Sequence, residues 1–219
     1  MAVEIVDNHT LEAYARRIVA KVERFNKEYS AVTFTEPLPE NIRPGHLIAA
    51  DEPGPDVHIS GCRMSGNRAR GLLIGSRGRV IIENNYFHIA GASILFEGDG
   101  NFWFEQSGVR DVTIRNNIFA NGNYGSRGWG SACIAVGSGI SQRQTSRYHR
   151  NIQVDGNLFR VFDPRIVNLY CVDGFQFSAS NRIVRTSDYP ATFDPKLHFV
   201  FDQCDHIEIP RQIEMAEQR

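Results

Sequence analysis

One short pattern, apolar-x-apolar-x-x-Asn-x-Phe, recurs along this 219-residue chain and constrains its fold more than any other feature. Full copies cover residues 80–87, 112–119 and 152–159, and weaker copies begin at Val57 and Phe175. Each copy alternates like a β-strand and then meets an Asn, which suits a turn because its side chain bonds the backbone and it tolerates left-handed φ. In the copy from Val57, Cys62 takes the place of the Asn.

A second short apolar strand follows each of the first four copies, at residues 72–74, 94–96, 134–136 and 167–169. Such a pair, repeated with a basal period of about 23 residues and interrupted by insertions, is typical of a solenoid. The sequence therefore predicts an all-β fold, a right-handed parallel β-helix. The expected inward ladders are Leu72/Ile94/Ile134/Val167 and Ile74/Phe96/Val136/Leu169. An antiparallel sandwich is the alternative, whereas a doubly wound α/β fold would need longer gaps between strands.

Helical spacing occurs once, before the first strand pair. Apolar residues from Leu11 to Tyr29 fall three, four, seven and eight positions apart, with charged residues between them. This spacing predicts one amphipathic α-helix over residues 10–29. We therefore expect residues 1–33 to form an N-terminal helix that caps the solenoid, and residues 34–219 to form the parallel β-helix domain.

Charge and composition narrow the function classes. Lys and Arg number 24 against 25 Asp and Glu, so no net positive field favours a nucleic-acid partner. No stretch approaches the roughly 20 apolar residues of a membrane span, so no membrane partner is expected. The N-terminus lacks the pattern of a signal peptide, which leaves the localisation unassigned. The four cysteines match no zinc or redox spacing, so we expect free thiols. We also expect no bound metal and no cofactor. The sequence does not decide the oligomeric state, and a homo-oligomer is one possibility.

Acidic and aromatic residues gather in the insertions. Glu97 follows a second strand, in the slot that Gly75 and Gly137 occupy one coil before and after, so its carboxylate has an open approach. Asp99, Glu105 and Trp103 follow in the same insertion. Two carboxylates and a flat ring are what glycoside hydrolysis requires. We therefore predict Asp99, Glu105 and Glu97 as catalytic residues and Trp103 as a sugar platform; the alternative is that these acids only solvate a loop.

Neighbouring coils supply the predicted sugar contacts. Asn67, Arg68 and Arg70 precede the acidic insertion by one coil, and Asn123, Tyr124 and Trp129 follow it by one coil. A sugar held at the insertion could therefore be bonded from three successive coils. One of the two arginines could instead pair with an acid of the insertion.

Several of these segments resemble one known family. They are residues 67–73 (NRARGLL), 91–99 (GASILFEGD), 103–105 (WFE) and 109–114 (VRDVTI). They look like the β-helix region of glycoside hydrolase family 110, the exo-acting α-1,3-galactosidases associated with blood-group-B-type glycans. The resemblance implies a metal-independent, inverting hydrolase that removes terminal α-galactose, with full-length relatives secreted or periplasmic. It also implies that this chain corresponds to the C-terminal part of that β-helix domain.

The chain departs from the family pattern at one place. After residues 37–45 (PLPENIRPG), where the family pattern leads us to expect an acid, the chain has His46. A shortened relative could therefore bind a terminal α-galactoside without hydrolysing it. The competing functions are thus an α-galactosidase-like hydrolase and a non-catalytic carbohydrate-binding or structural β-helix, with a polysaccharide lyase ranked last because no dense acidic Ca²⁺ cage is seen.

Overall fold

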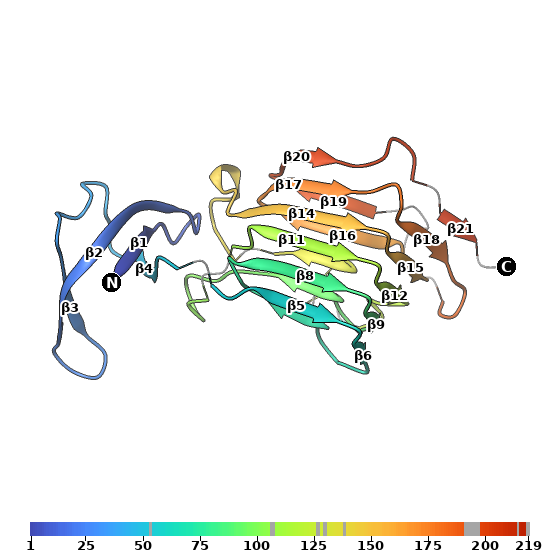
Figure 1. Cartoon of the computed structure of the whole chain (residues 1–219), viewed down its shortest axis with the longest axis horizontal. Coiled ribbons are helices and arrows are strands. Elements are labelled where there is room, and N and C mark those ends of the chain that lie inside the picture. Colours follow the sequence, from blue (N-terminus) through green and yellow to red (C-terminus); the bar gives the residue numbers. More distant parts are fainter. Residues whose placement is uncertain are drawn as a thin grey trace.

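The computed structural model describes residues 1–52, 54–105, 108–125, 128, 131–137, 139–190, 198–213 and 215–217. Figure 1 shows two parts in a row, an antiparallel sheet that holds the N-terminus and a longer stack of parallel strands. Within the described residues no helix is long and apolar enough to cross a membrane.

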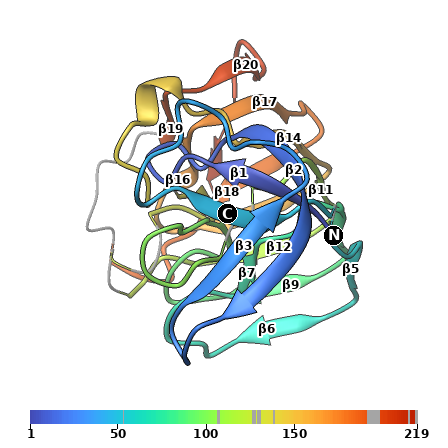
Figure 2. The same cartoon turned by 90° about the vertical axis from the view of Figure 1, so that its left-hand side faces the viewer.

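The antiparallel part is a four-stranded sheet in the order β3-β2-β1-β4. Its strands are β1 (Ala2–Val6), β2 (Ala13–Arg24), β3 (Ser30–Phe34) and β4 (Leu47–Ala50). Viewed along the molecule, β2 and β3 lie in front of the parallel stack (Figure 2). The sheet thus extends to β4, past the domain boundary predicted after residue 33.

The predicted helix over residues 10–29 is wrong, because this segment forms β2 and the turn that leads into β3. Leu11 has a φ of 58°, and its N–H donates to the Asp7 carbonyl at 2.8 Å, which turns the chain back so that β2 pairs with β1. The apolar spacing serves no common buried face, since Ile18 and Val22 are 54% and 59% exposed. The first half of β2 pairs with β1 and its second half with β3, and this tertiary pairing overrides the helical spacing.

The parallel part consists of three sheets, and one strand from each sheet makes up a coil. The first sheet contains β5 (Val57–Ser60), β8 (Arg79–Glu83), β11 (Asp111–Arg115), β14 (His149–Asp155), β17 (Val172–Phe177) and β20 (Asp205–Glu208). The second contains β6 (Arg63–Ser65), β9 (Tyr86–His88), β12 (Ile118–Ala120), β15 (Leu158–Val161), β18 (Arg182–Arg185) and β21 (Met215–Glu217). The third contains β7 (Leu72–Ile74), β10 (Ile94–Phe96), β13 (Ile134–Val136), β16 (Arg165–Tyr170) and β19 (His198–Asp202). A short 3₁₀ turn, η2 (Arg143–Thr145), lies between β13 and β14.

These three in-register parallel sheets are consistent with a β-helix and confirm the predicted ladders. In the third sheet, Ile94 pairs with Leu72 and Ile134, and Phe96 pairs with Ile74 and Val136. Phe96 and Ile134 are fully buried. The second sheet contributes a stack of rings, in which Phe119 lies 5.2 Å from Phe87 and 4.7 Å from Phe159 with nearly parallel planes. The core is therefore a column of apolar side chains that runs through all coils.

The repeated Asn residues stack at the corner between the first and second sheets, as predicted. Asn117 Oδ1 accepts from Asn85 Nδ2 at 3.1 Å, and Asn157 Oδ1 accepts from Asn117 Nδ2 at 3.0 Å. Asn157 in turn donates to Asn181 Oδ1 at 3.0 Å. The weak copy from Phe175 holds one extra residue, so its ladder position is Asn181 rather than Ser180. The side-chain amide of each of these Asn residues thereby finds a hydrogen-bond partner in the Asn of the next coil.

The insertions after β10 and β13 attach the antiparallel sheet to the parallel stack. Ser146 Oγ donates to the Thr10 carbonyl at 2.7 Å, and Gln142 N–H donates to the His9 carbonyl at 3.1 Å. Arg77 Nη1 and Nη2 donate to Glu4 at 2.6 and 2.8 Å, which joins the first coil to β1. The two parts are therefore connected through loops that also border the predicted site.

The register predicts how two neighbouring positions of the third sheet respond to truncation. Phe96→Ala removes a fully buried ring and should lower the free energy of unfolding by about 3–5 kcal/mol. Leu73→Ala, on the outward and exposed side of β7, should change it by less than about 1 kcal/mol. Urea unfolding monitored by circular dichroism measures both, and an equal effect of the two changes would contradict the register.

A buried histidine makes stability depend on pH. His149 is fully buried, its Nε2 lies 3.2 Å from the Gly137 carbonyl, and burial lowers its pKa to about 3. Between pH 6.5 and the lowered pKa, the unfolded chain binds up to one proton more than the folded chain. The free energy of unfolding therefore decreases as the pH is lowered, by up to about 1.4 kcal/mol for each pH unit. His149→Leu should reduce this acid slope in urea unfolding between pH 7 and pH 5. A variant whose stability falls as steeply as the wild type's would contradict the assignment.

Candidate functional site

The predicted acids meet in one hollow at the corner that follows the third-sheet strands. This acid hollow has a volume of about 570 Å³ and is lined by Arg70, Leu73, Glu97, Gly98, Asp99, Phe102, Trp103, Glu105 and Gly139. Its size suits a small ligand such as a sugar residue. Five of the residues predicted for the site, all three acids among them, therefore lie around one space.

Glu97 has the open position that the ladder predicts. It directly follows Phe96 of β10, which pairs with Ile74 and Val136, so Gly75 and Gly137 lie next to it on the adjoining coils. A Cβ added to Gly137 would lie 3.4 Å from Glu97 Oε1. A methyl group at this position would touch the carboxylate at van der Waals distance, and glycine leaves that space open.

Asp99 organises the loop that carries the other acid and the aromatic rings. Its Oδ1 accepts the N–H of Asn101 at 2.8 Å, and its Oδ2 accepts the N–H groups of Phe102, at 3.0 Å, and Trp103. These backbone donors, Trp103 N–H first, lower the pKa of Asp99 against the opposing effect of desolvation. Asp99 is therefore held ionised, and its charge fixes the shape of residues 99–105, which we call the aromatic loop.

The aromatic loop closes on itself and presents its side chains outward. The Asp99 N–H donates to the Glu105 carbonyl at 3.1 Å in an antiparallel bridge, which brings the two ends of the loop together. Glu105 is exposed, and Trp103 is 71% exposed with its ring 4.8 Å from that of Phe102. Exposed indole and phenyl rings beside carboxylates can receive the apolar face of a sugar.

The predicted contacts from the preceding coil divide between the hollow and the surrounding loop. Arg70 lines the acid hollow, whereas Asn67 uses its Nδ2 to donate to the Arg70 carbonyl. Arg68 is exposed in the same loop between β6 and β7 and is not part of the lining. Arg70 is thus the residue of this group that the structure brings to the acids.

Two of the three predicted contacts from the following coil, Asn123 and Tyr124, are not part of the lining of the acid hollow. Asn123 is buried, and in the orientation that satisfies its amide it bonds the backbone of Gly91, Ala132 and Cys133, each at 3.2 Å. Tyr124 lies in the loop after β12, where its ring stacks 5.1 Å from that of His88. Trp129 lies outside the described residues.

His88, the last residue of β9, contacts the backbone of the next coil. Its Nδ1 bonds the Ala120 carbonyl of the next coil at 2.8 Å. The imidazole therefore supports the loop that carries Tyr124 rather than facing the acid hollow.

Sequence reasoning missed the residues that support the aromatic loop from below. Gly100 packs on Leu11 and Leu47, because a Cβ at this position would lie 2.5 and 2.7 Å from their methyl groups. Asn8 Nδ2 donates to Asn101 Oδ1 at 3.3 Å. The prediction of a helix over residues 10–29 gave no reason to expect contacts between the N-terminal segment and the aromatic loop, so this support was not predicted.

Tyr148 is a second missed residue. It is buried beside the loop and its hydroxyl donates to the Gly137 carbonyl at 3.4 Å. Burial raises the pKa of Tyr148, with smaller contributions from the charges of Cys171 and Glu97. The hydroxyl therefore stays protonated near the strand end that faces Glu97.

The described residues contain no group of three or more His, Cys, Asp or Glu side chains that could hold a metal ion. The side chains that line the acid hollow carry carboxylates, a guanidinium and aromatic rings. This donor set suits proton transfer and the recognition of hydroxyl groups.

Comparison with known proteins relates the chain to bacterial enzymes. A family model described as GLAA-B beta-barrel domain II matches residues 1–48. Alpha-1,3-galactosidase A of Shewanella woodyi is 38% identical over 181 residues, which are 82% of this chain and 29% of the relative. Alpha-1,3-galactosidase B of Bacteroides thetaiotaomicron is 34% identical over 206 residues, 93% of this chain and 33% of the relative. The corresponding protein B of Akkermansia muciniphila is 29% identical over 210 residues, 94% of this chain and 26% of the relative.

These matches agree with the resemblance that the sequence motifs indicate. The chain spans a third or less of the length of these relatives. It is a homologue of the bacterial α-1,3-galactosidases A and B of glycoside hydrolase family 110 over most of its own length.

Proposed function

We propose that the acid hollow binds the terminal α-linked galactose of a glycan and takes part in hydrolysing its glycosidic bond. The observation that carries this proposal is that Glu97, Asp99 and Glu105 line one hollow together with the exposed ring of Trp103. Homology to proteins named α-1,3-galactosidases supports the choice of sugar. The activity is a proposal for this chain because it spans a third or less of those relatives.

The hydrogen bonds that Asp99 accepts guide the role that we propose for each acid. An inverting hydrolase needs one protonated carboxylic acid to protonate the leaving oxygen and one carboxylate to activate water. Asp99 is poorly suited to donate a proton, because the loop N–H groups stabilise its ionised form. We therefore assign the proton donor to Glu97 or Glu105 and the ionised role to Asp99.

Recognition of the sugar would combine stacking with hydrogen bonds. Trp103 would receive one face of the galactose ring, and the Arg70 guanidinium would donate to hydroxyl oxygens. Gly137 and Gly139 would leave the approach to the carboxylates open from the following coil.

A specific observation also favours a second candidate, binding without hydrolysis. Both oxygens of Asp99 already accept backbone N–H groups of its own loop, so this charge has a structural task whether or not chemistry occurs. In that case the same hollow would hold galactose, and the acids would serve as hydrogen-bond acceptors.

Substitution of the acids tests the catalytic proposal. Glu97→Gln, Asp99→Asn and Glu105→Gln keep the side-chain shape, and the change that removes a catalytic acid or base should lower kcat on an α-galactoside about 100-fold or more. Asp111→Asn is the matched control, because Asp111 is an exposed acid outside the hollow at the start of β11. Release of galactose, with ¹H NMR of the first anomer formed, is the measurement, and inversion predicts β-galactose.

The outcomes separate the two candidates. Hydrolysis at the wild-type rate by all three variants would refute the catalytic assignment. A wild-type protein that binds methyl α-galactoside but releases no galactose from α-galactosides would favour the binding-only function. If it neither hydrolyses nor binds the sugar, the whole proposal fails.

A further inference from the structure

Three arginines line a small hollow at the joint between the N-terminal sheet and the parallel stack. This arginine hollow has a volume of about 180 Å³ and is lined by Glu4, Leu11, Glu12, Ala13, Arg77, Gly108, Arg110, Tyr148 and Arg150. It shares none of these residues with the lining of the acid hollow. Its volume is below the usual range of pockets for organic ligands, so it suits a small ion.

The parallel register brings two of the arginines next to each other. In the first sheet Val112 of β11 pairs with Ile152 of β14, and Arg110 and Arg150 lie two residues earlier on these adjoining coils. The Arg150 N–H donates to the Val109 carbonyl at 2.7 Å, which extends the contact between the coils to this point. Like charges at matching positions of neighbouring strands repel each other.

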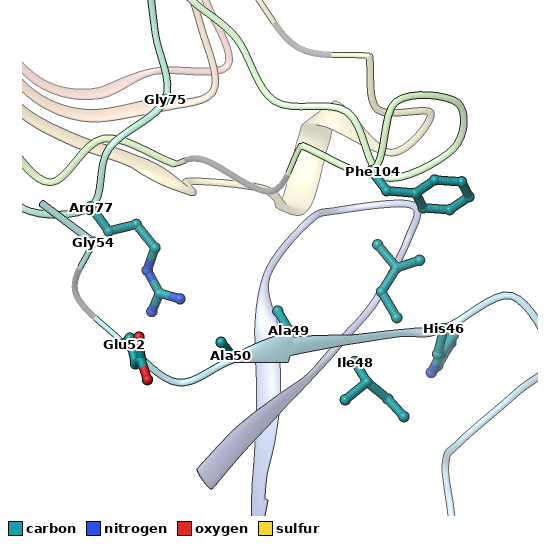
Figure 3. Close-up of a pocket in the computed structure, with 10 residues that line it drawn as sticks. His46, Ile48, Ala49, Ala50, Glu52, Gly54, Gly75, Arg77 and Phe104 are labelled. Carbon is teal, nitrogen blue, oxygen red and sulfur yellow. The ribbon is translucent and has the colours of Figure 1, made fainter. Parts of the chain in front are cut away.

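Arg77, from the coil before, brings a third guanidinium to the hollow. Figure 3 shows its side chain extending from the first coil towards β4 of the N-terminal sheet. Its Nη1 and Nη2 donate to Glu4, and the side chain is 11% exposed. Its Nε is buried and has no hydrogen-bond partner in the part of the chain that the structure describes. A hydrogen-bond acceptor that reaches this atom would therefore stabilise the fold.

Both carboxylates of the lining already accept hydrogen bonds from protein groups. Arg77 donates to Glu4, and the backbone N–H of Arg147 donates to Glu12 Oε1. The lining holds three guanidinium groups and two carboxylates, so it has an excess of one positive charge. The acids therefore do not cancel the charge of the arginines.

Arg110 and Arg150 are not paired with acids. Among the described residues, neither of them forms an ion pair. Partial burial and the charge of Arg77 lower the pKa of Arg110, and the charge of Glu4 opposes this shift. Both Arg110 and Arg150 are exposed, so an ion can reach them from solvent. A bound anion would reduce the repulsion between these groups.

We propose that the arginine hollow binds a small oxyanion, a phosphate or sulfate group, through Arg110, Arg150 and the Nε of Arg77. Guanidinium groups donate paired hydrogen bonds whose geometry matches the oxygens of such anions. The lining joins β1 and the turn before β2 to three coils, so a bound anion would stabilise the joint between the two parts. This site goes beyond the proposed function, since it does not depend on the acid hollow.

Inorganic phosphate is the probe for this site. Thermal unfolding of the full chain is measured at constant ionic strength with phosphate up to about 10 mM, because concentrated phosphate stabilises any fold by its exclusion from protein surfaces. The melting temperature should rise and then reach a plateau, since the ion binds the folded chain. Isothermal titration calorimetry then gives the Kd.

Single substitutions connect the effect to the hollow. Arg110→Gln and Arg150→Gln each remove one guanidinium and should weaken phosphate binding about tenfold or more. Arg79→Gln is the matched control, because Arg79 is a 66% exposed arginine at the start of β8 and outside the lining. It removes the same charge and should leave the Kd unchanged. Arg77 is kept, because its pair with Glu4 joins the first coil to β1.

The oxyanion can be a free ion or part of a larger molecule. Calorimetry with inorganic phosphate and with glycerol 3-phosphate, an ester that carries no galactose, separates these two sources. Tighter binding of inorganic phosphate assigns the hollow to a free ion, and tighter binding of the ester assigns it to a phosphate or sulfate group on a larger molecule.

Two results would overturn the proposal. One is a wild-type protein that shows neither a saturable rise of the melting temperature nor heat of binding with both phosphate compounds. The other is a phosphate affinity that Arg110→Gln and Arg150→Gln both retain. Thermal unfolding without phosphate shows whether each variant is folded, and if one of them is not, the other decides. Neither result bears on the galactose site, whose test uses other residues.

Discussion

Hydrogen bonding between successive coils is the constraint on which the rest of this structure depends. A parallel strand here has no partner within its own coil, so each coil must align with its neighbours to satisfy its backbone. The buried Asn ladder fixes that alignment, because Asn117 bonds Asn85 on one side and Asn157 on the other. A shift of one residue would turn the apolar ladders outward and leave these amides unpaired.

The candidate site is a consequence of that alignment. Glu97 meets Gly75 and Gly137 only because Phe96 pairs with Ile74 and Val136. The insertion after β10 then places carboxylates and rings at a corner that the coils hold still, and Asp99 gives the insertion its shape by accepting three backbone N–H groups. Packing of Leu11 and Leu47 against Gly100 ties the same insertion to the N-terminal sheet. Fold, loop and site are thus coupled through a few buried contacts.

Much of the parallel stack could be predicted from the sequence because its repeats are local. The Asn and the apolar positions recur at matching offsets, and this was enough to align Ile94 with Leu72 and Ile134. The site could be predicted only in part from the sequence. The predicted residues that share one insertion meet in the acid hollow, and these are Glu97, Asp99, Glu105 and Trp103. Asn123, from the following coil, instead bonds backbone groups. The N-terminal segment could not be read from periodicity, because its strands pair with partners whose positions depend on the Leu11 turn rather than on spacing.

A crystal structure of the protein with bound methyl α-galactoside tests the central claim most directly. The account predicts the galactose ring on Trp103, with its glycosidic oxygen within hydrogen-bond distance of Glu97 or Glu105 and its hydroxyl groups close to Arg70. Sugar density at another surface, such as the rings of Tyr124 and His88, with the acid hollow empty, would contradict it.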